Sequence, residues 1–531
     1  MIVACVAALG LVTSAGLTAA SAAAGTSGSA AAGQAPLVVR TSDGQIRGLY
    51  QGVAREFLGV PYAASTAGAL RWRPPRPHAP WRGIMRTARP GPTCAQTGSL
   101  ATGVLTTSTA ENCLNLNVYT PRQERGHPGL PVMVWIHGGA FTGGAGSIYD
   151  GAILAAQGHA IVVTINYRVN AFGFLALPSQ GKDQFSGEYG LIDQQAAMRW
   201  VRSNATAFGG DPRNVTIFGE SAGGASVCMT MTSPTARGLF EHAIAESGCL
   251  FPAPTRQQAD KQGLTLAASL GCVRPATAGA CLRAKPAAEI LKAEAGMGWS
   301  PVIGAPTLPE SPITAFLTGH YTHVPLLQGS NHDEGRFFVG LGFDVAQGHP
   351  MTRQQYPQVV AAQFGATNAK KILARYPLAH YRSPDLAYAA VFTDADFSCP
   401  ALFADDFTQR SRVYAYEFSD PNPPNDFGIH FSFPLGAAHS TELQYVFQRI
   451  PLLDTVPSFT RAQFRLSNLM IRYWSQFAAT GNPNGGHLPG WPRFGGTAPR
   501  IQELIPNATA PVPSARFAAF HECSFWASIE S

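Results

Sequence analysis

The sequence is poor in charged residues, and the charges that it has form no block. Asp, Glu, Lys and Arg make up 13% of 531 residues, and the net charge is only +6. No run of Lys or Arg is present, and basic residues do not interleave with aromatic ones. A basic stripe with stacking aromatics is the usual footprint of a nucleic-acid-binding protein, so that class has little support. The mean hydropathy of +0.01 is too low for a bundle of membrane helices.

Repeats, long linkers and metal-ligand clusters are also missing. No segment recurs at a fixed spacing, and no long Gly/Ser or charged linker interrupts the chain after residue 35. Histidine, cysteine and acidic residues do not gather at the spacings of a metal site. We therefore expect one large domain over residues 36–531 that requires neither a metal ion nor another cofactor.

The first 35 residues have the composition of an export signal followed by a small-residue leader. An apolar run at residues 1–12 precedes a tract of Ala, Ser and Gly, although no Lys or Arg precedes the run. Cleavage is expected near residues 22–24, and the run is too short and too rich in alanine for a retained membrane span. We expect a secreted protein without a stable membrane anchor, and a monomer.

A glycine-flanked serine follows a short apolar run in the middle of the chain. Residues 215–218 read Val-Thr-Ile-Phe, and residues 219–223 read Gly-Glu-Ser-Ala-Gly. This pattern predicts a strand that ends in a sharp turn, where the hydroxyl of Ser221 projects above a sheet. The backbone N–H of Ala222 would then point to the place where an oxyanion forms. A Gly-x-Ser-x-Gly match alone is weak evidence in a glycine-rich chain.

A second glycine loop lies upstream of this serine and strengthens the prediction. Residues 130–136 form the apolar pattern of a buried strand, and residues 137–141 read His-Gly-Gly-Ala-Phe. Such a loop can direct backbone N–H groups at an incoming carbonyl oxygen. The two motifs, in this order, predict a hydrolase with a nucleophilic serine and a two-part oxyanion hole.

A serine hydroxyl becomes a good nucleophile only when a base removes its proton and an acid orients that base. His439 lies in a small-residue loop and is the candidate base. Asp333 and Glu334 are adjacent at the exit of an apolar strand, and chemistry alone allows either to be the acid. The other candidate bases are His332 and His430, which we expect to be surface or loop residues. The order serine, acid, histidine is that of the α/β-hydrolases.

Several segments together resemble the type B carboxylesterase and lipase family, which includes cholinesterases, bacterial carboxylesterases and fungal lipases. These segments are residues 57–63, 111–119, 137–141, 166–168, 190–194, 208–212, 219–223, 332–335, 436–443 and 480–484. The resemblance implies an α/β-hydrolase fold, with a mostly parallel central sheet flanked by helices and with cap or gorge insertions near residues 250–323 and 351–395. We expect strands at residues 130–136, 160–166, 215–219, 243–246, 325–329 and 413–418, and helices at residues 191–208 and 465–479.

The resemblance also implies roles for single residues. Ser221 would be the nucleophile, His439 the base, and Glu334 rather than Asp333 the acid. The oxyanion donors would be the N–H groups of Gly139, Ala140 and Ala222, which leaves His137 to the architecture of its loop. The residues expected near the substrate pocket are Phe141, Glu220, Phe337 and Phe338.

The sequence has nine cysteines, and Cys5 falls in the leader. The resemblance implies the disulfides Cys94–Cys113, Cys272–Cys281 and Cys399–Cys523. The two cysteines without a counterpart in the family, Cys228 and Cys249, are expected to be buried free thiols. Disulfides of this number support export to an oxidising compartment.

The loop at residues 95–112 bears on the substrate. Cholinesterases hold a quaternary ammonium group against aromatic rings of this loop, and fungal lipases use the loop as a lid. Here it contains no aromatic residue, and its large apolar residues are Leu100, Val104 and Leu105. The resemblance therefore implies an esterase for small to medium carboxylic esters, with no preference for choline esters. A triacylglycerol lipase and a catalytically inactive binding protein on the same fold remain as alternatives.

Overall fold

The computed structural model describes residues 36–99, 106–122, 129–181, 183–425, 429–449 and 456–529. Two predictions lie outside these residues. They are the export signal and leader of residues 1–35, and the contribution of Leu100, Val104 and Leu105 to a lid.

The centre of the molecule is an eleven-stranded sheet in the order β14-β13-β12-β11-β10-β9-β7-β8-β6-β4-β3. Every neighbouring pair from β13 to β8 is parallel, and the pairs at both ends are antiparallel. The strands are β3 (Leu49–Gln51), β4 (Ala54–Pro61), β6 (Asn115–Pro121), β7 (Leu130–Ile136), β8 (Ile161–Ile165), β9 (Gly210–Glu220), β10 (His242–Glu246), β11 (Leu326–Asn331), β12 (Val413–Phe418), β13 (Arg500–Leu504) and β14 (Ala510–Pro513). The mostly parallel sheet and its six expected strands are confirmed. A separate small sheet joins β1 (Val38–Arg40), β2 (Gln45–Arg47) and β5 (Ile84–Arg86).

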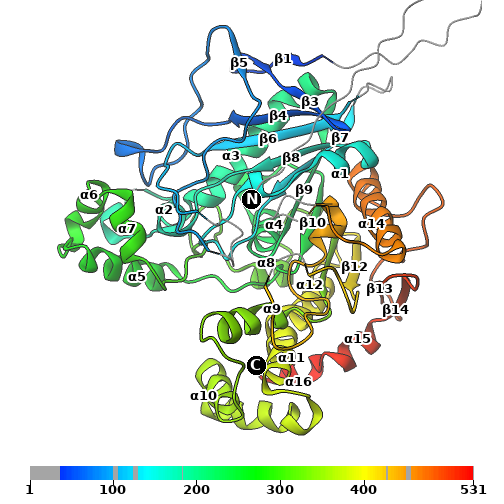
Figure 1. The fold of residues 1–531 in the computed structure, drawn as a ribbon. Helices are drawn as coiled ribbons and strands as arrows, with labels where there is room; N and C mark the ends of the chain where they lie inside the picture. The colour runs from blue at the N-terminus through cyan, green and yellow to red at the C-terminus, as the bar shows by residue number, and fades with distance from the viewer. Residues whose placement is uncertain are drawn as a thin grey trace, which may run out of the picture.

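Strand β7 shows why these apolar runs form strands. Val134 and Ile136 point into one core, whereas Met133 and Trp135 point into the other. Because both faces of a parallel sheet are covered, such a strand is continuously apolar. Helices α3 (Tyr189–Asn204) and α4 (Ala222–Thr232) complete the first core, and α1 (Ala152–Gly158), α13 (Leu443–Phe447) and α14 (Arg461–Thr480) complete the second (Figure 1).

Helix α14 begins earlier than the sequence pattern predicts. The apolar periodicity predicts a helix over residues 465–479, whereas α14 starts at Arg461. Thr460 accepts a hydrogen bond from the N–H of Gln463, and the Gln463 side chain returns to the N–H of Thr460. This capping box extends the helix by one turn. The helix ends where Gly481 adopts a left-handed conformation with φ 68°.

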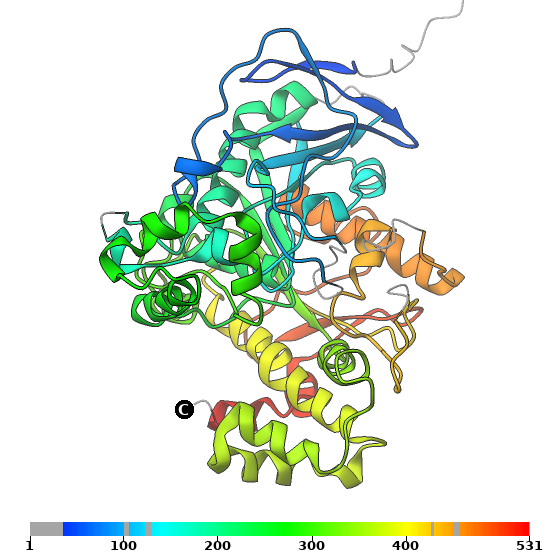
Figure 2. The ribbon, with the colours of Figure 1, turned by 60° about the vertical axis from the view of Figure 1, so that its left-hand side comes forward.

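Two groups of helices extend beyond the central sheet, in the segments where insertions were expected. Helices α5 (Arg256–Ser269), α6 (Ala278–Arg283) and α7 (Ala287–Ala293) form one group, at the left of Figure 1. Helices α10 (Gln355–Arg375) and α11 (Pro384–Thr393) form the other, next to the C-terminal helix α16 (Cys523–Ile529). Figure 2 shows both groups from a second direction, one at the left of the sheet and the other below it.

Four disulfides cross-link the described part of the chain. Three are the expected pairs, Cys94–Cys113, Cys272–Cys281 and Cys399–Cys523. The prediction that Cys228 and Cys249 are free thiols is wrong, because they form the fourth disulfide. Helix α4 packs on β10, and this contact brings the two Cα atoms to 5.3 Å. Disulfides of this number indicate an oxidising compartment. Of the helices in the described ranges, none is both long and apolar enough to span a membrane.

Candidate active site

Ser221 sits at the junction of β9 and α4, in a conformation that few residues adopt. Strand β9 ends at Glu220 and α4 begins at Ala222, so Ser221 alone makes the turn, with φ 59° and ψ −124°. Its N–H donates to the carbonyl of Glu246 on the neighbouring strand β10, at 2.9 Å. A strained backbone of this kind persists only where its surroundings hold it, and such residues cluster at functional sites.

The two glycines around Ser221 are required by the close approach of β7. A Cβ on Gly219 would lie 2.6 Å from the carbonyl oxygen of Ile136, and a Cβ on Gly223 would lie 2.0 Å from the same atom. Neither position has room for a side chain. The glycines of the motif therefore let α4 begin directly against the end of β7.

The glycine loop after β7 lies beside Ser221. Gly139 and Ala140 both have positive φ, at 104° and 53°, and they line the same cavity as Ser221. The carbonyl of Gly139 accepts hydrogen bonds from the N–H groups of Thr142 and Gly143, which close the loop on itself. Within the described chain, the N–H groups of Gly139, Ala140 and Ala222 donate to no other residue. They are available to a ligand.

His137, the first residue of that loop, is part of its framework. Its ring stacks on Tyr167 with 4.3 Å between centroids, and the Tyr167 hydroxyl donates to the carbonyl of His137 at 2.8 Å. Burial lowers the pKa of His137 to about 4, so the ring is neutral.

His439 and Glu334 form a buried pair. Nδ1 of His439 lies 2.6 Å from Oε2 of Glu334, whose other oxygen accepts the N–H of Asn331 at 2.8 Å. Asp333 turns away from the histidine, to the guanidinium of Arg336 at 2.8 Å. The structure therefore brings Glu334, and not Asp333, to His439.

The two other candidate bases lie elsewhere. His332 packs on Phe520, with 4.5 Å between ring centroids, and its Nδ1 lies 3.3 Å from Asp333. His430 is exposed. Neither lines the cavity that contains Ser221.

Glu220 occupies the other side of the imidazole. Its Oε1 lies 3.0 Å from Nε2 of His439 and accepts a hydrogen bond from the hydroxyl of Ser440 at 2.7 Å. The hydroxyl of Ser221 makes no hydrogen bond to His439 in this arrangement. Burial opposes a charge on His439, but Glu220 and Glu334, one against each ring nitrogen, raise its pKa well above the usual value.

Two further carboxyl groups lie beneath this cluster. Burial, together with the charge of Glu220, raises the pKa of Glu442 well above its usual range and that of Glu246 to about 8. Glu246 accepts a hydrogen bond from the indole of Trp474 at 2.9 Å, and Glu442 accepts one from the amide of Asn331. Burial therefore disfavours the charged form of both carboxyl groups.

Aromatic rings enclose the histidine. Phe338 and Phe397 lie 4.7 and 4.9 Å from the His439 ring, and Phe337 lines the cavity with Phe338. Phe141, which was also expected near the pocket, is 4% exposed and packs edge-on against Phe174, with 5.3 Å between ring centroids. It is not among the residues that line the cavity.

The chain near the C-terminus supports the wall that carries Phe397. His521 lies between two acids, with Nδ1 2.5 Å from Asp394 and Nε2 2.8 Å from Glu417. Asp394 begins the π-helical turn η10 (Asp394–Ser398), which contains Phe397. Cys399, the residue directly after this turn, forms a disulfide with Cys523 of α16. Burial opposes a charge on His521, but hydrogen bonds to both acids raise its pKa to about 10.

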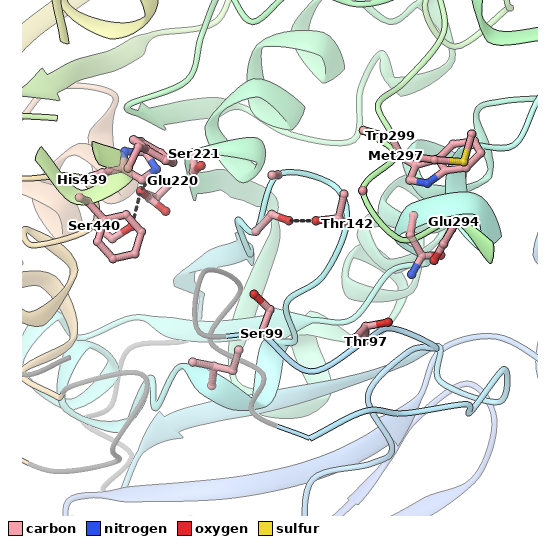
Figure 3. Close-up of a pocket in the computed structure, with 18 of the residues that line it drawn as sticks. Thr97, Ser99, Thr142, Glu220, Ser221, Glu294, Met297, Trp299, His439 and Ser440 are labelled. Atoms are coloured by element: carbon pink, nitrogen blue, oxygen red, sulfur yellow. Dashed lines mark hydrogen bonds and ion pairs between the residues drawn. The ribbon is translucent and has the colours of Figure 1, made fainter. Parts of the chain in front are cut away.

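A cavity of about 480 Å³ opens beside Ser221. In Figure 3, Ser221, Glu220, His439 and Ser440 stand at one side, and Glu294, Met297 and Trp299 stand at the other, with Thr142 between them. Phe397, Ser440 and the residues of the second side were not predicted from the sequence. The only signal for the latter was the irregular pattern between residues 250 and 323.

Comparison with known proteins agrees with this geometry. The sequence model of the carboxylesterase family matches residues 35–526. The chain is 35% identical to fumonisin B1 esterase of Sphingopyxis macrogoltabida, over 86% of this chain and 84% of the relative. It is 34% identical to para-nitrobenzyl esterase of Bacillus subtilis strain 168, over 86% of this chain and 92% of the relative.

A solved structure of a thermophilic PNB esterase superposes with a TM-score of 0.77 at 32% identity, and the match covers 91% of this chain and 99% of the other. The fold is thus the α/β-hydrolase fold. Family, fold and the named esterases agree on one activity, the hydrolysis of carboxylic esters. The chain belongs to the carboxylesterase family.

Proposed function

We propose that this protein is a serine carboxylesterase that cleaves small to medium carboxylic esters through an acyl-enzyme. One observation carries the proposal. Ser221, His439, Gly139 and Ala140 line one cavity, Glu334 contacts His439, and Ala222 directly follows Ser221. Nucleophile, base, orienting acid and oxyanion donors are the complete set that acyl transfer requires.

In the first half-reaction, His439 takes the proton of Ser221 while the serine oxygen attacks the ester carbonyl. The N–H groups of Gly139, Ala140 and Ala222 stabilise the oxyanion, and His439 then protonates the departing alcohol. In the second half, His439 activates a water molecule, which releases the acid from Ser221. Glu334 holds the imidazole tautomer and stabilises the imidazolium cation.

In the free enzyme, Glu220 rather than Ser221 contacts the Nε2 atom of His439, and we infer that this is a resting state. Nε2 of His439 faces Glu220 and must exchange this contact for the hydroxyl of Ser221 before proton transfer. Catalytic hydrogen bonds are often completed only when substrate is bound. The exchange removes one of the two carboxylates that hold the proton on His439, which lowers its pKa towards the range of a general base.

The cavity supports the proposed substrate size. A volume of about 480 Å³ is within the usual range for small-molecule sites, about 300 to 1,000 Å³. Its walls combine apolar side chains, such as Phe337, Phe338 and Leu291, with polar ones, such as Thr142 and Asn170. The four disulfides support secretion, and we infer that the partner is a small-molecule ester met by a monomeric enzyme outside the cytosol.

The test is the hydrolysis of p-nitrophenyl esters from acetate to palmitate by the wild type and by Ser221→Ala. We expect a maximum of kcat/KM at short to medium acyl chains. Ser221→Ala should lower kcat by about 10⁶-fold, because the nucleophile is lost while binding and the oxyanion donors remain. Circular dichroism of both proteins establishes that the variant is folded.

Two outcomes would contradict the proposal in different ways. A maximum at palmitate would identify a lipase. Equal rates for the wild type and Ser221→Ala would show that Ser221 is not the nucleophile.

A further inference from the structure

Glu294 is a buried carboxyl group in the wall of the cavity that contains Ser221. Its exposed fraction is 7%, and one carboxylate oxygen, Oε2, accepts the N–H of Ala171 at 2.9 Å. Among the described residues, nothing donates to the other oxygen, Oε1. Burial raises the pKa of Glu294 to about 8, as is expected for a carboxyl group with one neutral donor and no cation.

Glu294 begins a stretch of six consecutive residues that line the cavity. Residues 294–299, which follow α7, all line the cavity, and the N–H of Met297 donates to the carbonyl of Glu294 at 2.9 Å. Trp299 belongs to this wall, is 6% exposed, and its indole N–H has no partner in the described chain. Figure 3 shows Glu294, Met297 and Trp299 together, across the cavity from Ser221.

In the part of the chain that the structure describes, the cavity contains two carboxyl groups, and its one basic side chain, His439, contacts only one of them, Glu220. The described residues that line it include the carboxyl groups of Glu220 and Glu294 but no Lys or Arg. Both contacts of Glu220, with His439 and with Ser440, use its Oε1 and tie this carboxyl group to the histidine. Among the described residues, Glu294 contacts no basic side chain, and the one hydrogen bond of its carboxyl group comes from the N–H of Ala171. An ionised Glu294 would repel an anionic substituent. A cation would satisfy the unpaired carboxylate and lie near an indole ring, the aromatic side chain that attracts cations most strongly.

We propose that the cavity takes esters that carry an ammonium group with at least one N–H, and that Oε1 of Glu294 accepts a hydrogen bond from it. This substrate class rests on the proposed function, in which Ser221 cleaves the ester in the same cavity. The group differs from the quaternary ammonium of choline esters, because it needs an N–H to donate. Glu294 is thereby a specificity residue, and Trp299 forms the neighbouring wall.

The test measures binding without turnover. Calorimetric titration at pH 9 of Ser221→Ala compares n-alkylammonium ions, from ethyl to octyl, with primary alcohols of the same length. At this pH Glu294 is ionised, and the amines are still mostly protonated. We expect the ammonium ion that spans the cavity to bind about 10- to 100-fold more tightly than its alcohol, the range for a hydrogen bond between charged groups.

Glu294→Gln, added to Ser221→Ala, should abolish this preference, because glutamine keeps an oxygen for Ala171 but carries no charge. The matched control is Glu289→Gln, which removes the same charge from an exposed position on α7, 53% accessible. It should leave the preference unchanged.

Three results would overturn the proposal: equal affinities for ammonium and alcohol, a preference that survives Glu294→Gln, or alkyltrimethylammonium ions bound as tightly as primary ones. Because Ser221→Ala is used throughout, these results do not depend on esterase activity. A failure of the proposed function would appear only in the p-nitrophenyl ester series, so the two failures are distinguishable.

Discussion

The Cys228–Cys249 disulfide lies directly behind the nucleophile turn. Cys228 is in α4, the helix that begins after Ser221, and Cys249 follows β10, whose Glu246 carbonyl holds the N–H of Ser221. The perturbation is the double variant Cys228→Ala/Cys249→Ala. It removes the covalent link between the two elements that position the serine.

The magnitude follows from the lengths of the closed loops. The sequence separation of 21 residues for Cys228–Cys249 gives about 3.3 kcal/mol of stabilisation in the loop-entropy model. The separation of 9 residues for Cys272–Cys281 gives about 2.6 kcal/mol. Cys272→Ala/Cys281→Ala, in the outlying α5–α6 insertion, is therefore a control with a similar cost in stability. Only the first variant should also lower kcat, because only it loosens the turn at Ser221.

The assay combines guanidinium unfolding, followed by tryptophan fluorescence, with p-nitrophenyl butyrate hydrolysis. A thiol titration of the denatured wild type, over residues 36–531, gives an independent count. We expect no free thiol, since all eight cysteines of that range are paired. Two thiols per chain would refute the pairing. A double variant as stable and as active as the wild type would refute the role assigned to the bond.

Two substitutions beside Ser221 test the site itself. Gly223→Ala places a Cβ 2.0 Å from the carbonyl oxygen of Ile136, so it should cost about 1 to 3 kcal/mol in unfolding experiments and lower kcat as the turn shifts. Gly342→Ala, whose Cβ would meet no atom within 4 Å, is the control and should change neither quantity. Glu220→Gln removes one of the two carboxylates that raise the pKa of His439. Protonated His439 cannot act as a base, so the acid limb of the kcat/KM profile should move to lower pH, and an unmoved limb would contradict this account.

Much of the fold could be predicted because its signals are local. Strands such as β7 are apolar on both faces, and the turn at Ser221 needs its glycines within two residues of the serine. Local sequence did not decide whether Asp333 or Glu334 is the acid that orients His439. Both follow the same strand, and the family resemblance was needed to choose the residue that the structure brings to His439.

The missed features depend on contacts between distant segments. The Cys228–Cys249 bond forms because α4 packs on β10, and no spacing rule encodes that contact. Phe141 packs on Phe174, a residue 33 positions later in the chain, and local sequence does not predict that contact. Glu294 lies in the first expected insertion and Phe397 just after the second, and the place of both beside the cavity or His439 depends on contacts between distant segments.

His521 contacts Asp394 of η10, and Cys523 is bonded to Cys399 directly after η10. These contacts bear on the order in which the parts of the chain can fold. Phe397 lies against His439, but its turn is fastened by residues more than a hundred positions later in the chain. A chain emerging from the ribosome can therefore form β7, β9 and the turn at Ser221 long before the histidine has its final surroundings. Activity should appear only after residues 514–529 have docked and Cys399 has been oxidised. We therefore expect the nascent chain to stay inactive until α16 has docked and the Cys399–Cys523 bond has formed.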